Sequence, residues 1–86
     1  MFSTKDKNGN AVEVGARVRV IEIRPSVLNR LAAKDANAVR TMKGEVFPVY
    51  EVDEWGSAWV KKWWNAGEQK SFSHSIALAP DEMELE

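Results

Sequence analysis

The chain has 86 residues, of which 44% are hydrophobic and 29% charged, and its 12 Lys and Arg residues nearly balance its 13 Asp and Glu residues. This composition is typical of a globular protein rather than a disordered chain, and the length predicts a single domain spanning residues 1–86. Because the chain contains no cysteine, a disulfide framework and a thiolate metal site are excluded. The single histidine, His74, excludes motifs that need several histidines, and we expect no metal ion and no cofactor.

The expected cellular location follows from the same features. Residues 1–7 lack the apolar stretch of a secretory signal peptide. No apolar run approaches the roughly 20 residues that are needed to cross a bilayer. Small secreted domains usually depend on disulfides, so we expect a cytoplasmic protein that does not bind membranes.

The first predicted elements are β-strands. An Asn-Gly dipeptide at residues 8–9 is typical of a tight hairpin turn. It predicts that residues 2–5 pair with residues 11–14, with Val12 and Val14 on one face.

A longer strand is predicted for residues 17–23, where apolar and polar side chains alternate. The alternation slips within this run, because Val18 and Val20 share one face while Ile21 and Ile23 share the other. We therefore expect either a bulge near Ile21 or a strand whose two faces are both partly covered.

A helical insertion is predicted between Pro25 and Lys43. Ser26 is a candidate N-cap after the proline ends the strand, and apolar residues recur at helical spacing from residue 27 to residue 42. Asp35 interrupts this apolar stripe and could cap a second piece, so one or two short helices are expected.

Residues 45–52 form the next predicted strand. Pro48 has no N–H to donate, so it should lie at a sheet edge or a bulge. The alternation places two sets of side chains on opposite faces: Phe47 and Val49 on one, and Val46, Tyr50 and Val52 on the other.

The last third of the chain is predicted to consist of strands and turns. A turn at residues 53–57 leads into a strand at residues 58–64, which is antiparallel to the strand before it. Ser71 and Phe72 could begin a further strand, the Ser-His-Ser sequence at 73–75 is typical of a tight turn, and 76–78 continues briefly. A final strand is expected near 83–85.

Short strands with turn signals about every 10 residues predict an all-β fold, a small β-barrel with a helical insertion. A two-layer α+β sandwich is the alternative. The Lys-Gly-acidic strand opening at 43–52, the aromatic hairpin at 55–61 and the Ser-His-Ser segment before the last strand resemble an SH3-like barrel. The resemblance is closer to small stand-alone bacterial SH3-like proteins of unassigned function, and it implies one SH3-like domain over residues 1–86.

Four tryptophans, all between residues 55 and 64, form the strongest local signal. Strand alternation places Trp59, Lys61 and Trp63 on one face, with Val60 and Trp64 on the other. We expect Val60 and Trp64 in the core, whereas Trp59 and Trp63 could be core or exposed. Because tryptophan is enriched at binding hot spots, the leading hypothesis is a non-enzymatic interaction module that binds a protein partner through a Trp-rich hairpin face. The predicted contact residues are Tyr50, Trp55, Trp59 and Trp63.

The charge distribution suggests an alternative. Residues 1–43 carry a net charge of +5 and residues 44–86 a net charge of −6. A basic face beside exposed tryptophans is the chemistry of single-stranded nucleic-acid binding. The possible nucleic-acid contacts are Arg17, Arg19, Arg30, Arg40, Lys61 and Lys62. We favour the simpler interpretation that the two halves neutralise each other in the folded protein.

Catalysis is not predicted. His74 lies between Ser73 and Ser75, and immediate sequence neighbours do not readily reach the geometry of a Ser-His-acid triad. No glycine pattern typical of a nucleophile elbow or of a phosphate-binding loop is present. We therefore expect His74 to be a turn residue and the protein not to be an enzyme.

Overall fold

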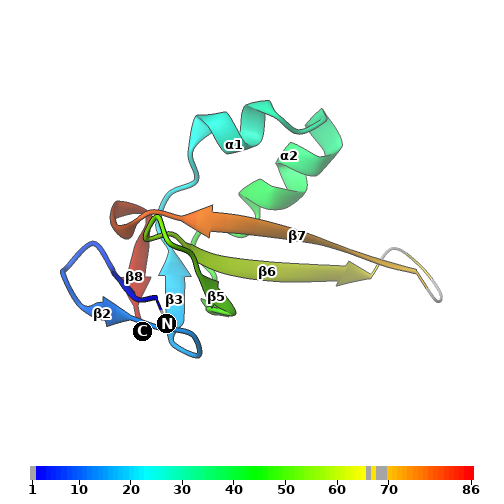
Figure 1. Ribbon diagram of the computed structural model, residues 1–86. Helices are drawn as coiled ribbons and strands as arrows, with labels where there is room; N and C mark the ends of the chain where they lie inside the picture. Colours follow the sequence, from blue (N-terminus) through cyan, green and yellow to red (C-terminus); the bar gives the residue numbers. More distant parts are fainter. Residues whose placement is uncertain (1, 66, 68–69) are drawn as a thin grey trace.

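The computed structural model describes residues 2–65, 67 and 70–86 (Figure 1). Short strands dominate, with two helices and one 3₁₀ turn. In chain order the elements are β1 (Thr4–Lys5), β2 (Ala11–Val12), β3 (Arg17–Val20), α1 (Pro25–Asn29), α2 (Ala33–Arg40), β4 (Val46–Pro48), β5 (Glu51–Val52), β6 (Ala58–Asn65), β7 (Ser71–Leu78), η1 (Pro80–Glu82) and β8 (Met83–Leu85). The fold is therefore mostly β with a small helical part, as the strand and turn signals in the sequence predicted.

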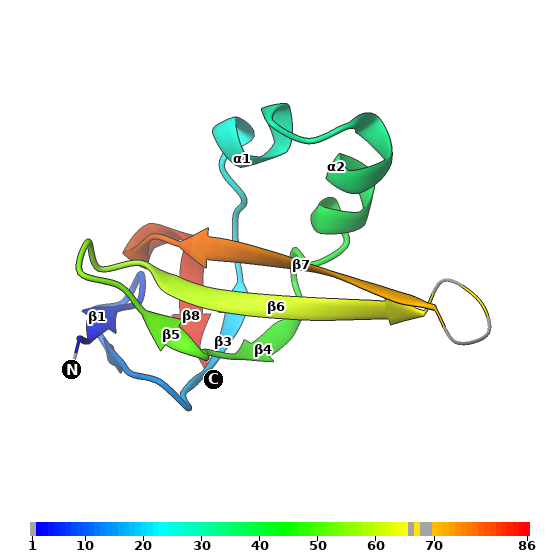
Figure 2. The same cartoon turned by 45° about the vertical axis from the view of Figure 1, so that its right-hand side comes forward.

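The strands form three antiparallel sheets with the orders β1-β2, β4-β3-β8 and β5-β6-β7. Figures 1 and 2 show β3 and β8 crossing the base of the long β6–β7 hairpin, whose two strands extend away from the body. In both views α1 and α2 lie beyond β7, on the side away from β5. Within the described residues no sheet closes on itself, so the closed barrel that the sequence predicted is not observed.

The core lies where the base of the hairpin meets the β4-β3-β8 sheet. Val18 and Val20 of β3 are fully buried, and they meet Val60 of β6 and Leu78 of β7 in the same cluster. Met42, which follows α2, is also fully buried. The helical insertion therefore closes one side of a core that strands from two sheets provide.

The N-terminal hairpin is confirmed, but it is shorter than predicted. Thr4 pairs with Val12 and Lys5 with Ala11, around a turn in which Gly9 has a φ of 82°. Val12 is buried whereas Val14 is 57% exposed. The prediction that Val12 and Val14 share a face is wrong, because β2 ends at Val12.

The slip in alternation after Val20 marks the end of β3. The strand stops at Val20, and the next residue, Ile21, donates its N–H to the Glu82 carbonyl at 2.8 Å. Ile23 is buried in the irregular segment that follows. The Glu22 N–H donates to the same Glu82 carbonyl at 3.4 Å, so two residues oppose one at the end of β3, which is the bulge that was one of the two expectations.

The helical insertion consists of two short helices, one of the two possibilities that the sequence left open. The proposed caps are wrong. Pro25 occupies the first turn of α1, where its fixed φ suits a helix start, so the N-cap is Arg24 and not Ser26. The N-cap of α2 is Ala32, and Asp35 lies inside the first turn.

The strand predicted for 45–52 is divided between two sheets. β4 pairs with β3, and β5 pairs with β6. Between them, the Tyr50 N–H donates to the Trp59 carbonyl at 3.1 Å while Glu51 is in register with the same Trp59. Two residues therefore oppose one, which is the arrangement of a β-bulge.

This bulge resets the alternation. Phe47 and Val49 were predicted to share a face and are both buried, but Val52 is buried with them, so its placement on the opposite face was wrong. Tyr50 is turned outward and is 45% exposed. Pro48 lies in β4 at the edge of its sheet, which confirms the expectation from its missing N–H.

The predicted turn at 73–75 is wrong. Ser73, His74 and Ser75 lie in the middle of β7, in register with Trp63, Lys62 and Lys61. Pairing with β6 overrides the local preference of a Ser-His-Ser sequence. A 3₁₀ turn, η1, immediately precedes the last strand, and β8 lies where the final strand was predicted.

Candidate functional site

The two faces of the β6–β7 hairpin carry different side chains. In an antiparallel pair, residues in register point to the same face. Here Ala58 and Val60 face the core together with Leu78 and Ile76. The opposite side of the hairpin, which we call the outer face, carries Trp59, Lys61 and Trp63 of β6 and Ser71, Ser73, Ser75 and Ala77 of β7.

The most exposed part of the outer face is a group of two aromatic rings and one cation. Trp63 is 64% exposed and Tyr50 is 45% exposed. The Lys61 Nζ lies 5.4 Å from the centre of the Tyr50 ring and 5.6 Å from that of Trp63. These distances are within the range of cation–π attraction, so Lys61 joins the two rings into one surface.

Trp59 is held more rigidly than its neighbours. Its indole Nε1 donates to Asp53 Oδ2 at 3.0 Å, and the side chain is half-buried. The Asp53 carboxylate also accepts the backbone N–H groups of Ser57 and Trp55. The Ser57 N–H, followed by the Trp59 indole, lowers the pKa of Asp53 below its usual value, so the group that fixes Trp59 remains an anion.

Trp55 lies apart from this group. It is 81% exposed in the turn between β5 and β6. There it lines a shallow hollow of about 380 Å³ together with Phe2 and residues 51–54. Three of the four predicted contact residues therefore lie along the outer face: Tyr50, Trp59 and Trp63. Trp55 lies apart from them, in the turn that precedes β6.

The helix side of the hairpin carries an aromatic cluster that the sequence analysis missed. The rings of Trp64 and Phe72 stack with centres 5.2 Å apart, and His74 meets both rings edge-on. Trp64 packs against the core from a half-buried position, which agrees in part with its predicted core role. Alternation of apolar residues at 72, 76 and 78 is the signal that could have revealed the strand and this cluster.

His74 connects this cluster to α2. Its Nε2 lies 3.4 Å from Asp35 Oδ1, but this nitrogen is buried and has no hydrogen-bond partner within the described part of the chain. A hollow of about 250 Å³ lies beside it, lined by Lys34, Asp35, Phe72, Ser73 and His74. His74 is therefore a strand residue facing a helix rather than the turn residue that was expected.

The possible nucleic-acid contacts are dispersed. Arg19 bonds to the Gly44 carbonyl and pairs with Glu86, and Lys62 pairs with Glu45. Lys62 projects from the face of β6 opposite to Lys61. The remaining three residues are exposed at separate places: Arg17 on β3, Arg30 after α1, and Arg40 on α2, where it bonds to Asn37.

The two oppositely charged halves of the chain meet along β8. Three of the five Lys or Arg ion pairs formed by the described residues join the first half to the last residues: Lys7–Glu84, Arg19–Glu86 and Arg24–Glu82. Folding therefore mixes the +5 and −6 halves there, as the simpler interpretation of the charge distribution predicted.

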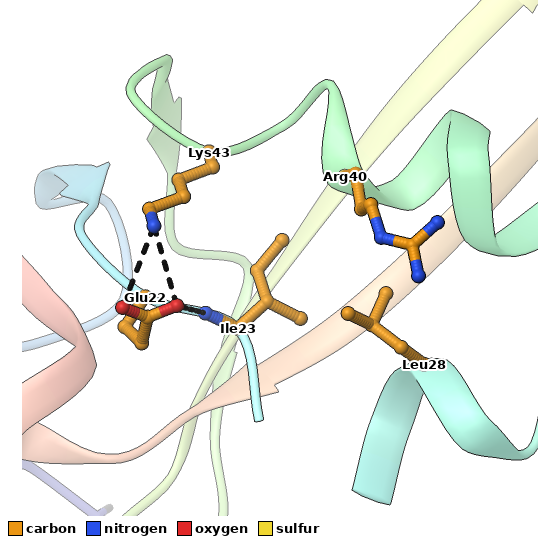
Figure 3. Close-up of a pocket in the computed structure, with 5 residues that line it drawn as sticks. All are labelled: Glu22, Ile23, Leu28, Arg40 and Lys43. Atoms are coloured by element: carbon orange, nitrogen blue, oxygen red, sulfur yellow. Dashed lines mark hydrogen bonds and ion pairs between the residues drawn. The ribbon is translucent and has the colours of Figure 1, made fainter. Parts of the chain in front are cut away.

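A further hollow, beneath the helices, has two cationic side chains, Arg40 and Lys43, in its wall (Figure 3). It has a volume of about 240 Å³ and a floor of Ile23 and Leu28. Lys43 points to Glu22 and is bonded to its carboxylate, while Arg40 extends toward Leu28. Because Glu22 neutralises one of the two cations, the hollow offers little attraction to an anionic ligand.

Comparison of the chain with models of known protein families, with curated proteins and with solved structures found no match. Within residues 2–65, 67 and 70–86 no helix is long and apolar enough to cross a membrane. The same residues contain no group of three or more His, Asp or Glu side chains placed to hold a metal ion.

Proposed function

We propose that this protein is a small, non-enzymatic interaction module that binds a protein partner through the outer face of the β6–β7 hairpin. The observation that carries the proposal is the pair of exposed rings, Tyr50 and Trp63, joined by Lys61. Large exposed aromatic side chains are unfavourable in water and are enriched at the centres of protein interfaces. Trp59 gives the same surface a rigid half-buried anchor, and Trp55 offers a second contact at the turn.

A protein partner is favoured over a single-stranded nucleic acid because few cations lie beside the exposed rings. Lys61 is the cation in contact with both Tyr50 and Trp63. Arg19 and Lys62 are occupied by carboxylates. Tight phosphate binding needs several uncompensated cations along one track, and the six possible contacts do not form one.

The proposed fold that presents this face is an opened SH3-like barrel. Its support is the order of the elements: a helical insertion between β3 and β4, a β5–β6 hairpin with tryptophan at its turn, and a 3₁₀ turn before β8. The crossing of the β4-β3-β8 sheet over the base of the hairpin is also consistent with a small orthogonal barrel. An experimental structure with β-ladder hydrogen bonds between the two three-stranded sheets would support closure.

The proposed function is tested by capture from a nuclease-treated lysate of the source organism. The double variant Tyr50→Ala with Trp63→Ala should lose the captured partner while keeping its thermal stability, because both side chains are exposed. Ala32→Ser, which changes an exposed residue at the N-cap of α2 on the helix side of the hairpin, should retain it. Equal capture by the double variant would contradict the proposal.

Salt dependence separates the two kinds of partner. Binding through aromatic contacts should change little between about 50 and 200 mM salt, whereas a complex that neutralises several phosphates should weaken by orders of magnitude. A filter-binding assay with single-stranded RNA provides the direct comparison. Retention of RNA at low salt that disappears with Lys61→Gln would favour the nucleic-acid alternative.

A further inference from the structure

The edges of the sheets are protected unequally. β4, at one edge of its sheet, is short and contains Pro48. The other edge of that sheet, β8, is covered by the N-terminal hairpin, because the Lys7 N–H donates to the Met83 carbonyl at 3.0 Å and the Leu85 N–H to Asp6 Oδ2 at 2.7 Å. Short length, proline and covering segments are the usual means by which proteins prevent pairing at a sheet edge.

β7 is neither short nor interrupted by proline, although α1 and α2 lie on the side of its free edge (Figures 1 and 2). It is an edge strand of eight residues, Ser71–Leu78, and among the described residues its one partner strand is β6. Its sequence contains no proline, lysine, arginine, aspartate or glutamate. The end that begins at Ser71 projects beyond α2 (Figures 1 and 2). A long edge without these features is a template for an added strand.

The direction of the backbone groups in β7 follows from the bulge. The Trp59 carbonyl accepts from Tyr50, so the backbone groups of Trp59 point toward β5. Backbone groups alternate in direction along an antiparallel strand, and therefore those of Ala58, Val60 and Lys62 point toward β7. Their register partners in β7 are Leu78, Ile76 and His74.

The intervening residues of β7, Ser73, Ser75 and Ala77, consequently direct their N–H and C=O groups away from β6. None of these groups has a hydrogen-bond partner among the residues that the structure describes. They form a row of donors and acceptors at the spacing that an extended peptide requires.

The space beside this edge also suits an added strand. On the outer face the β7 side chains are serines and an alanine, which leave room for larger side chains on a neighbouring strand. On the helix side the hollow of about 250 Å³ between α2 and β7 is lined by Phe72 and His74. Alternate residues of an incoming peptide would therefore meet an open polar face and a partly apolar hollow.

The charges near the edge favour acidic residues on that peptide. Lys61 is in register with Ser75, so its Nζ would leave the Tyr50 and Trp63 rings and reach over the small serine to meet a long carboxylate side chain on the added strand. Lys34 lines the hollow and Lys70 immediately precedes β7, while Asp35 is the acidic residue at the hollow. Among the residues that the structure describes near this edge, three cations are therefore set against one anion.

We propose that the free edge of β7 binds an extended acidic segment of a partner protein as an added β-strand. The proposal rests on the proposed function and names the chemistry of the partner. Main-chain hydrogen bonds to Ser73, Ser75 and Ala77 hold the segment. Acidic side chains on its outer face reach Lys61, and apolar side chains on its other face enter the hollow beside Phe72.

The test uses a synthetic peptide of about nine residues that alternates glutamate and valine, with its lysine–valine counterpart as the charge control. Amide hydrogen exchange of the full chain, measured by NMR, reports on the edge directly. The glutamate peptide should slow exchange at Ser73, Ser75 and Ala77 by at least about tenfold, since these N–H groups become hydrogen-bonded. The lysine peptide should leave them unchanged.

Two variants sharpen the test. Ser75→Pro removes one outward N–H, which an edge strand tolerates, and should abolish peptide binding, whereas Ser75→Ala keeps the N–H and should bind normally. Lys61→Gln should weaken the glutamate peptide by about two- to fivefold, the range of an exposed ion pair. Slow exchange of these amides in the protein alone, increasing with its concentration, would show that a second copy occupies the edge and would overturn the proposal.

Failure of this inference and failure of the proposed function give different results. If the Tyr50 and Trp63 double variant loses its natural partner but neither peptide protects β7, the outer face binds its partner without strand addition. If the glutamate peptide protects β7 while the double variant still captures the partner, the edge is a binding site and the aromatic surface is not.

Discussion

The β6–β7 hairpin consists of two regions that share one pattern and differ in what lies beneath them. At its base, Ala58 and Val60 pair with Leu78 and Ile76, and all four side chains are at most 3% exposed. In the projecting part, which we call the arm, alternation continues through pairs such as Trp64 with Phe72. Those two rings are half-buried, and they cover each other by stacking.

The comparison shows that strand alternation alone does not define a core. Aliphatic residues suffice at the base, because β3 and the segment after α2 complete their burial. Where the body ends, aromatic side chains replace them, since a large ring can bury apolar area against a neighbouring ring. We infer that the base stabilises the fold and that the arm is free to bind.

The largest effect that tests this difference is expected at the base. Leu78→Ala should lower the free energy of unfolding by about 3 kcal/mol, because a fully buried leucine leaves a cavity. Denaturant unfolding followed by tryptophan fluorescence measures it. Ile76→Val, a smaller deletion in the same region, should cost about 1 kcal/mol. A loss below about 1 kcal/mol for Leu78→Ala would contradict the assignment of the core to the base.

A smaller effect is expected in the arm, although a larger side chain is removed. Phe72→Ala should cost about 1–2 kcal/mol, less than the usual value for a buried phenylalanine because the ring is half-exposed. The same denaturant experiment compares it with Leu78→Ala directly. Ser71→Ala, an exposed neighbour in the same strand, is the matched control and should be nearly neutral. Equal losses at positions 72 and 78 would remove the distinction between base and arm.

Acid should affect the body before the arm. Asp6, which lies against β8, accepts the Leu85 N–H, and this bond, with further bonds from Asn10 and Asn8, holds the pKa of Asp6 at about 2. A lowered pKa in the folded state stabilises the protein above the ordinary value of 3.8. That contribution is lost as the pH falls from about 4 to about 2.

The Tm of the protein should therefore fall in this pH range, with β8 losing amide protection before the base of the hairpin. Asp6→Asn should lower the Tm at neutral pH and flatten the acid dependence. Asp81→Asn, which changes an exposed carboxylate in η1, is the control and should retain the wild-type profile. A pH profile of Asp6→Asn as steep as that of the control would assign the acid sensitivity to other groups.

Local signals in the sequence predicted the elements that local interactions determine. The Asn-Gly turn, the two helices and the hairpin around Gly56 depend on turn and helix preferences over a few residues. The predictions failed where pairing between distant segments decides the outcome. Ser-His-Ser is drawn into β7 by eight register pairs with β6, and the bulge at Tyr50 arises where the chain passes from one sheet to another.

The candidate site was predictable to a similar extent. Alternation placed Trp59 and Trp63 on one face correctly, but their different exposure depends on Asp53, which bonds the Trp59 indole and leaves Trp63 without such an anchor within the described residues. The strand pattern placed Tyr50 opposite Phe47 and Val49, as observed, but it did not reveal the bulge that brings Val52 to the buried side. The cluster around His74 was missed entirely, because a turn was expected there.

The smallest expected effect on stability is that of replacing His74, which lies where the arm contacts α2. The buried Nε2 of His74 lacks a hydrogen-bond partner within the described chain, although Asp35 is near. A buried polar atom without a partner is destabilising, and replacing it by an apolar group of similar size is neutral or favourable. His74→Leu should therefore keep the stability or raise it by up to about 1 kcal/mol, measured by thermal unfolding.

His74→Ala is the matched control for this change. It also removes the unpartnered nitrogen, but it deletes the ring that packs against Trp64 and Phe72, so it should destabilise the protein by about 1 kcal/mol. A loss with leucine as large as that with alanine would mean that the imidazole is bonded in solution, through Asp35 or a water molecule. The arm would then be tied to α2 by a polar contact, and its freedom to bind would be smaller than the comparison with the base implies.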